Sequence, residues 1–150
     1  MRDDFFRALP RKFKEVILGA FRDKGRRWLE RLPEIIAEIE RAWSIEIKKP
    51  FPNLSYHFVA PCVSLADSSE AVVKIAFPGE AKGFVREAKT LEFCGGEGAV
   101  KLLRRDDKRF AMLLEKLSPG ENLKIVCRGN ERKAVEIAIE TMRRFWREPP

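Results

Sequence analysis

The sequence predicts an α+β fold: a five-stranded antiparallel sheet with a helix between its third and fourth strands, a helical N-terminal extension and a closing C-terminal helix. Hydrophobic residues recur every three to four positions over 10–43, 80–94 and 130–146, which is the period of an amphipathic helix. Between these stretches lie short alternating runs bounded by turn residues, which predict strands. Short strands joined by tight turns favour antiparallel pairing, with the intervening helix packed on one face of the sheet.

The helical extension is predicted to span residues 1–43. Pro10 suits the first position of a helix, and apolar residues follow it with helical spacing. Gly25 is predicted to interrupt this helix, because glycine lowers helix stability. A second apolar stripe follows and ends at Trp43, and Pro33 within it either kinks the helix or starts a new one.

The sheet and its helix are predicted to occupy residues 44–120. Five alternating or apolar runs predict the strands, which are 45–50, 55–62, 71–77, 99–103 and 109–117. In the second strand, Tyr56 is expected to share a face with Phe58 and Ala60, because side chains alternate along a strand. A charged tetrapeptide, 105–108, is expected to form the hairpin turn between the last two strands.

Residues 121–150 are predicted to form a linker helix that follows the sheet. Asn130 is a suitable N-cap, since its side chain can accept a hydrogen bond from a free N–H group in the first turn. The apolar stripe of this helix is expected to run from Ala134 to Trp146.

The composition excludes several classes of protein. Hydrophobic residues make up 45% of the 150, too many for a disordered chain, and the longest apolar runs, of about six residues, are too short to span a membrane. The three cysteines are widely spaced and form no Cys-x-x-Cys, so neither a disulfide framework nor a zinc site is expected. The N-terminus carries acidic residues and no apolar segment, so we expect no secretory signal and a cytoplasmic protein.

The side chains present also limit the chemistry. His57 is the only histidine, and neither a P-loop nor a Gly-x-Gly-x-x-Gly fingerprint occurs. The net charge of +7 favours an anionic partner, which could be a nucleotide or a nucleic acid. Basic runs lie at 11–14, 24–27 and 104–105, but runs of this kind are usually solvated helix faces, so nucleic acid is the less favoured partner.

Two charged residues interrupt apolar patterns. Lys74 lies in the third predicted strand and shares a face with Val72 and Ala76, whereas Glu87 lies on the apolar stripe of the following helix. Because an unpaired buried charge costs several kcal/mol, the two residues could pair across the packing of helix on sheet. Protein kinases hold their phosphate-binding lysine by such a pair. The alternative is that Lys74 lies at a sheet edge and extends its ammonium into water.

Several short segments of the chain, taken together and in their order, form a recognisable pattern. They are Trp28-Leu-Glu-Arg-Leu-Pro33, Trp43, Pro50-Phe-Pro-Asn-Leu-Ser-Tyr-His-Phe-Val-Ala-Pro61, Val72-Val-Lys-Ile75, Arg86-Glu-Ala88, Gly98-Ala-Val-Lys-Leu-Leu103 and Leu113-Leu-Glu-Lys-Leu-Ser-Pro-Gly120. The most specific of them is Leu-Ser-Tyr-x-x-Val-Ala-Pro at 54–61. In these segments the chain from about residue 16 to 150 resembles the aminoglycoside phosphotransferase superfamily, in the branch that contains streptomycin 6-kinase and hydroxyurea kinase.

The resemblance implies a protein-kinase-like N-terminal lobe that binds ATP with Mg²⁺. The loop between the first two strands would then cover the phosphates, Lys74 would contact the α- and β-phosphates, Glu87 would hold Lys74, and the backbone of a hinge segment would bind adenine. The implied nucleotide-binding residues are Asn53, Leu54, Ser55 and Tyr56 in the loop, Lys74, Glu87, and Glu115, Lys116 and Leu117 in the hinge. His57 stands where the family pattern has Asn, and it is either a structural residue of the strand or, as a cation, a phosphate contact.

In the complete enzymes a second, catalytic lobe supplies the aspartate that accepts the hydroxyl proton and the magnesium ligands. After Asp107 this sequence has no aspartate and no histidine, so we expect no catalytic or metal-binding residues in it and a chain that is truncated before the catalytic lobe. The acceptor in the complete enzyme would be a hydroxyl of an aminoglycoside such as streptomycin, or hydroxyurea, as in antibiotic-resistance kinases. The alternative is a non-catalytic interaction module that pairs with another chain through its interlobe face.

Overall fold

The computed structural model describes residues 8–146. The first seven residues of the predicted helical extension and the last four of the predicted linker helix lie outside the described residues. The elements in chain order are α2 (Arg11–Trp43), β1 (Ile45–Ile47), β2 (Phe58–Ser64), β3 (Glu70–Ile75), the short 3₁₀ helix η1 (Pro78–Glu80), α3 (Ala81–Cys94), β4 (Leu102–Asp106), β5 (Ala111–Glu115), α4 (Leu123–Val126) and α5 (Glu131–Phe145). The predicted α+β fold is confirmed: five strands form one antiparallel sheet, and a helix lies between the third and fourth.

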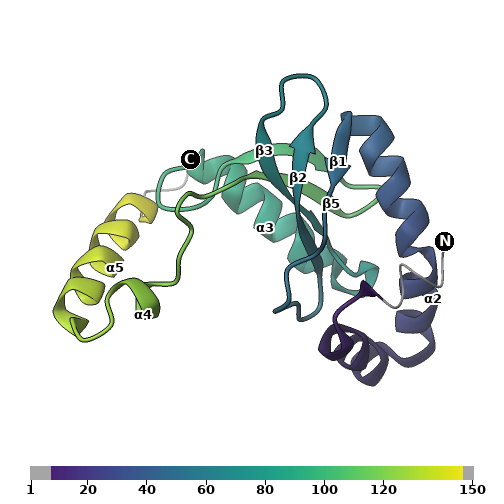
Figure 1. Ribbon diagram of the computed structural model, residues 1–150, viewed down its shortest axis with the longest axis horizontal. Helices are drawn as coiled ribbons and strands as arrows, with labels where there is room; N and C mark the ends of the chain where they lie inside the picture. The colour runs from purple at the N-terminus through teal and green to yellow at the C-terminus, as the bar shows by residue number, and fades with distance from the viewer. Residues whose placement is uncertain (1–7, 147–150) are drawn as a thin grey trace.

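The sheet has helices on both faces (Figure 1). Its strand order is β1-β2-β3-β5-β4, so β3 is the central strand. Alternate residues of β3 serve different faces: Val73 and Ile75 are fully buried with α2, whereas Val72 packs with α3. The buried residues on the α3 side are Ala76, Phe84, Ala88, Leu91, Met112 and Leu114.

Helix α2 covers the other face and contains a sharp kink. The kink is at Arg22, where φ is 46° and ψ is −123°, so the prediction that Gly25 interrupts the helix was wrong by three residues. Gly25 is buried against the preceding half of the helix, since a Cβ atom there would lie 2.6 Å from the carbonyl oxygen of Ile17. Pro33 lies inside the second half of α2 without a further break in its backbone angles.

The strand limits differ from the prediction at several places. The first strand ends at Ile47 and not at 50, and β2 begins at Phe58, because the chain bends over 55–57. Tyr56 therefore does not share a face with Phe58 and Ala60: its exposed fraction is 46%, whereas theirs are 1% and 0%.

The fourth strand lies three residues later than predicted, at Leu102–Asp106, and the fifth is shorter at both ends. The predicted turn at 105–108 is therefore displaced towards Phe110, because Arg105 and Asp106 pair with Met112 and Ala111 of β5. A register irregularity between Leu102 and Arg104 accompanies this pairing.

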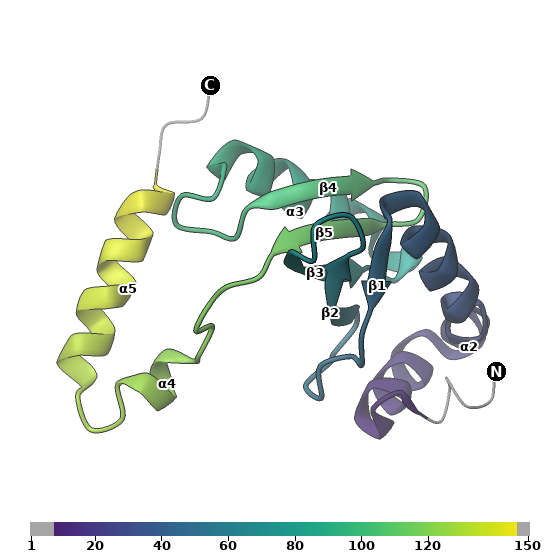
Figure 2. The same ribbon diagram turned by 45° about the horizontal axis from the view of Figure 1, so that its top comes forward.

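Helices α4 and α5 extend away from the sheet beyond β5 (Figure 2). Asn130 caps α5 as predicted, since its Oδ1 accepts a hydrogen bond of 3.0 Å from the N–H of Lys133. The end of α5 returns to the loop between α3 and β4, where a Cβ atom on Gly98 would lie 2.6 Å from the backbone nitrogen of Phe145. α5 therefore touches the body of the fold at its last turn.

Candidate functional site

The central strand places Lys74 against α3. Lys74 is opposite Val59 of β2 on one side and Met112 of β5 on the other, so it does not lie at a sheet edge. Its Nζ donates to both carboxylate oxygens of Glu87, each at 2.6 Å. The exposed fractions of the two side chains are 16% for Lys74 and 37% for Glu87. The structure therefore favours the paired interpretation over an edge lysine that extends into water.

His57 lies next to this ion pair, immediately before β2. Its Nδ1 accepts a hydrogen bond of 3.4 Å from the backbone N–H of Phe77, which requires that nitrogen to be unprotonated. Burial lowers the pKa of His57 from its ordinary value of 6.5, the ammonium of Lys74 lowers it further, and the carboxylates of Glu87 and Glu80 oppose these effects. A neutral His57 supports the structural role rather than the role of a cationic phosphate contact.

This environment predicts a pH dependence of stability. The unfolded chain binds a proton at His57 below pH 6.5, whereas the folded chain resists protonation because its pKa is lowered. The unfolded state then holds more protons, so the free energy of unfolding is expected to fall as the pH decreases through 6.5, and to level off below the folded-state pKa. Urea unfolding between pH 5 and 7.5 measures this decline. In His57→Gln, whose side-chain oxygen can still accept from Phe77, the decline should be absent; an unchanged decline would assign it to other groups.

A cleft of about 330 Å³ opens on the same face of the sheet, where the chain leaves β5. Its lining comes from separate segments of the chain: Phe51, Val72, Val100, Leu114, Glu115, Lys116, Leu117, Pro119 and Gly120. Val72 precedes Lys74 by two residues, so the cleft and the ion pair share one face of β3. The size and the largely apolar lining suit a planar organic ring.

The three predicted hinge residues all line this cleft. Glu115 is already engaged on the side of β4, since its backbone N–H donates to the carbonyl oxygen of Lys101 at 3.0 Å and its Oε1 accepts from the N–H of Lys101 at 2.6 Å. Lys116 forms an ion pair of 2.6 Å with Glu70 at the start of β3. Leu117 is 56% exposed. The side chains of Glu115 and Lys116 therefore fix the course of the hinge.

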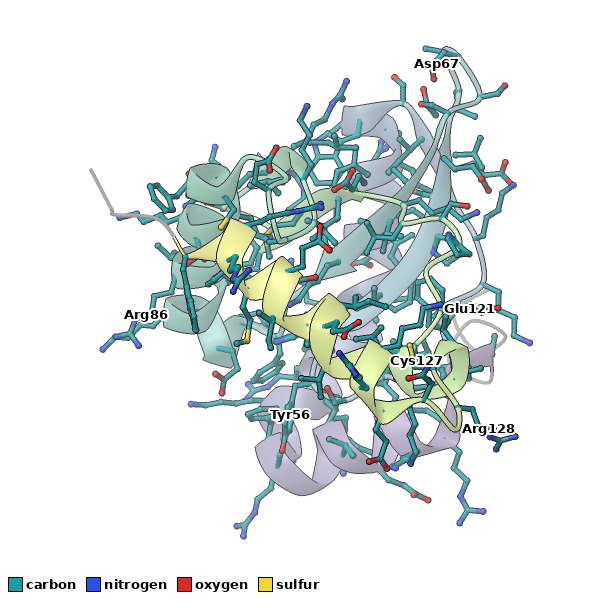
Figure 3. The ribbon with its side chains drawn as sticks, turned by 90° about the vertical axis from the view of Figure 1, so that its left-hand side faces the viewer. Tyr56, Asp67, Arg86, Glu121, Cys127 and Arg128 are labelled. Atoms are coloured by element: carbon teal, nitrogen blue, oxygen red, sulfur yellow. The ribbon has the colours of Figure 1, made fainter. Side chains whose placement is uncertain are left out.

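None of residues 53–56, the loop predicted to cover phosphates, is among the residues that line the cleft. Leu54 is buried in the core between the sheet and α2, which anchors the loop, while Asn53 and Ser55 are exposed. The ring of Tyr56 packs edge-on against Phe21, with centroids 5.8 Å apart. Figure 3 shows Tyr56 beside the first half of α2. Its place as a phosphate-covering loop stays a prediction.

The predicted residues thus fall into three groups: a paired Lys74 and Glu87, a hinge in the cleft, and a loop anchored at Leu54. The lining residues Phe51, Val72, Val100, Leu114, Pro119 and Gly120 were not predicted. Val72 could have been found from strand alternation, because it must share a face with Lys74. Phe51 lies in a turn, and no periodicity marks it.

Two searches of residues 8–146 bear on metals and membranes. No three His, Cys, Asp or Glu side chains in this part of the chain gather closely enough to hold a metal ion. No helix in the same part is both long enough and apolar enough to cross a membrane.

A five-stranded antiparallel sheet, with a strand lysine paired to a helix glutamate between its third and fourth strands, defines the N-terminal lobe of a kinase-like fold. A family model described as aminoglycoside/hydroxyurea antibiotic resistance kinase matches residues 52–150. The chain belongs to this family, which confirms the resemblance that its sequence segments indicated.

Curated relatives agree with the family match. A hydroxyurea phosphotransferase from Kitasatospora aureofaciens is 30% identical over 91% of this chain and 39% of its own length. A streptomycin 6-kinase from Streptomyces glaucescens is 29% identical over 77% of this chain and 36% of its own length, and one from Streptomyces griseus is 30% identical over 67% and 32%. The chain thus spans 32–39% of the length of these relatives. No solved structure matches significantly.

Proposed function

We propose that this chain is the ATP-binding N-terminal lobe of a small-molecule kinase that phosphorylates a hydroxyl group. The observation that carries the proposal is the ion pair of Lys74 and Glu87 beside the cleft at Glu115–Leu117. A carboxylate that accepts from a lysine holds the ammonium in place, which is what binding of the α- and β-phosphates requires.

The residues present suit ATP. The cleft of about 330 Å³ has apolar walls for adenine at Val72 and Leu114. Because the N–H and carboxylate of Glu115 are engaged by Lys101, we assign recognition of adenine to the backbone of Lys116 and Leu117. Lys74 would bind the phosphates, and Glu87 would hold Lys74. The loop of Asn53, Leu54, Ser55 and Tyr56 would cover the phosphates with its backbone N–H groups or the Ser55 hydroxyl.

ATP supplies the phosphoryl group, and the acceptor follows from the relatives. Their names indicate hydroxyurea and streptomycin as acceptors, so we propose an aminoglycoside or hydroxyurea hydroxyl here. The base that takes the hydroxyl proton and the ligands of Mg²⁺ would come from a catalytic lobe, since the sequence has no aspartate after Asp107. Phosphoryl transfer depends on such positioning and charge, so both lobes are needed for turnover.

Calorimetric titration of Mg-ATP into the purified chain tests the proposed nucleotide site. We expect saturable binding that weakens about tenfold or more in Lys74→Ala, because a charge-assisted contact to phosphate is worth about 1.5–3 kcal/mol. Lys89→Ala is the matched control, because it removes the same charge from an exposed position of α3, two residues from Glu87.

The outcomes of this titration are distinct. Equal weakening by Lys74→Ala and Lys89→Ala would show a general charge effect and contradict the assignment of Lys74. A folded chain that binds no Mg-ATP at millimolar concentration would contradict nucleotide binding by this lobe. Circular dichroism of each variant separates loss of the site from loss of the fold.

The apolar stripe of α5 supports a protein partner as well. Val135, Ile139, Met142 and Trp146 recur at helical spacing and are 42–68% exposed. We propose that this stripe is covered by the catalytic lobe, in the same polypeptide or in another. The simplest alternative is that the stripe joins two copies of this chain, and light scattering after size-exclusion chromatography tests it. We expect a monomer over a hundredfold range of concentration. A dimer that Val135→Glu abolishes would assign the stripe to self-association instead.

A further inference from the structure

A second cavity, of about 520 Å³, lies between α2 and the turn that joins β4 to β5. It shares no lining residue with the cleft at the hinge. Its charged lining residues are Arg27 and Arg31 on α2, Glu38 about two helical turns beyond Arg31, and Lys108 and Arg109 in the turn. Its apolar walls are Trp28, Ile35, Pro78 and Phe110.

The lining contains four cationic side chains and one carboxylate, Glu38, which is already paired with Arg109. Arg109 bridges the two elements of the cavity, with 2.7 Å contacts to Glu38 on α2 and to Asp106 on β4. Arg31 and Lys108 form no ion pair with any residue in 8–146, and Arg27 contacts only the carbonyl oxygen of Asp23, at 3.4 Å. Among the described residues, the cavity therefore holds three cationic groups without a carboxylate partner around the Arg109–Glu38 bridge.

Trp28 supplies a second, independent observation. The residue is only 5% exposed, and its indole Nε1 is a buried polar atom that finds no hydrogen-bond partner among the described residues. An unpaired buried donor costs about 1–3 kcal/mol, so this nitrogen is a point of weak packing beside the cavity. Trp28 lines the cavity, so its ring can contact the carbon skeleton of a bound molecule.

We propose that this cavity binds a small organic phosphate, with the phosphate among Arg27, Arg31 and Lys108 and the carbon skeleton against Trp28, Ile35 and Phe110. One arginine side chain can donate two parallel hydrogen bonds to two phosphate oxygens. Three cations without a carboxylate partner also balance a doubly charged phosphate better than they balance a singly charged carboxylate ligand. The volume exceeds that of inorganic phosphate and is typical of sites for small molecules. This site is separate from the proposed ATP site and does not depend on it.

Phenyl phosphate is the probe, and the indole N–H signals in a nitrogen-15 NMR spectrum are the readout. The three tryptophans give three such signals, and Trp28→Phe assigns the one from Trp28. We expect phenyl phosphate to shift the Trp28 signal in a saturable manner, while the signal of Trp146, at the far end of α5, stays in place. Inorganic phosphate and benzoate are titrated in parallel, and both should bind several-fold more weakly than phenyl phosphate.

The variant Arg31→Ala with Lys108→Ala removes two exposed cations of the cavity, and should weaken phenyl phosphate about tenfold or more. Arg26→Ala with Lys89→Ala removes the same charge at exposed residues outside the cavity and should change the affinity less than about twofold. Equal weakening by the two double variants would overturn the proposal, as would a Trp28 signal that does not move at about 10 mM phenyl phosphate. Benzoate binding as tightly as phenyl phosphate would overturn the choice of phosphate.

Discussion

Replacing Lys74 by Met is expected to lower the free energy of unfolding by about 1–3 kcal/mol, because the change leaves the carboxylate of Glu87 without its partner. The side chain of Glu87 is 37% exposed, so water compensates part of the loss and the upper range for fully buried pairs is not reached. Methionine retains the length and most of the volume of lysine, so packing against Met112 should change little. Urea unfolding at pH 7 measures the difference.

A double-mutant cycle separates the ion pair from other effects of the substitution. Lys74→Met with Glu87→Leu should regain much of the stability, since a well-packed apolar pair often replaces an ion pair without loss. Lys89→Met, at an exposed residue of α3, should change stability by less than about 0.5 kcal/mol. If the losses of the two single variants simply add in the double variant, Lys74 and Glu87 do not stabilise each other.

Replacing Gly25 by Ala is expected to destabilise the fold by at least about 2 kcal/mol, because the new methyl group meets backbone that cannot move away. A Cβ atom at Gly25 would lie 2.6 Å from the carbonyl oxygen of Ile17 and 2.9 Å from its Cγ2. Ile17 is fully buried beneath the kink, so relief requires the two halves of α2 to separate and expose apolar core.

Gly19 offers a matched control in the same helix. It is exposed, and no atom lies within 4 Å of an added Cβ, so Gly19→Ala should stabilise the protein by about 0.5–1 kcal/mol through helix propensity. The same chemical change is thus expected to have opposite signs at two positions six residues apart. Stabilisation by both substitutions would show that the two halves of α2 do not approach closely at Gly25.

The order of elements could be predicted from the sequence because each has its own hydrophobic period, but the breaks could not. The sequence predicts a helix break at Gly25, whereas in the structure the small size of this residue permits a close contact between segments that only folding brings together. The kink itself is at Arg22, which nothing in the local sequence marks. The charged residues 105–108 predict a turn, but an edge strand such as β4 also tolerates charge: Arg105 forms an ion pair there with Glu92 of α3.

For the candidate site, the sequence marks Lys74 and Glu87 and leaves their pairing open, and it does not reveal the cleft. Lys74 and Glu87 each break an apolar pattern of a single element, so the sequence marks both. The cleft combines Phe51 from a turn, Val72 from β3 and the segment after β5, and no local pattern links these parts. The position of Tyr56 was missed because alternation was extended back from Phe58 through a bend of the chain.

The alternation along β3 has a consequence for how this lobe can change over generations. Val73 and Ile75 pack against α2, while their neighbours Val72 and Lys74 face α3 and the cleft. Substitutions at Val73 and Ile75 should therefore be limited by the stability of the fold. Substitutions at Val72 and Lys74 should be limited by the binding of a ligand. Residues next to each other in the chain can change independently, and the α2 side of the lobe can be remodelled without altering what the cleft on the α3 side binds.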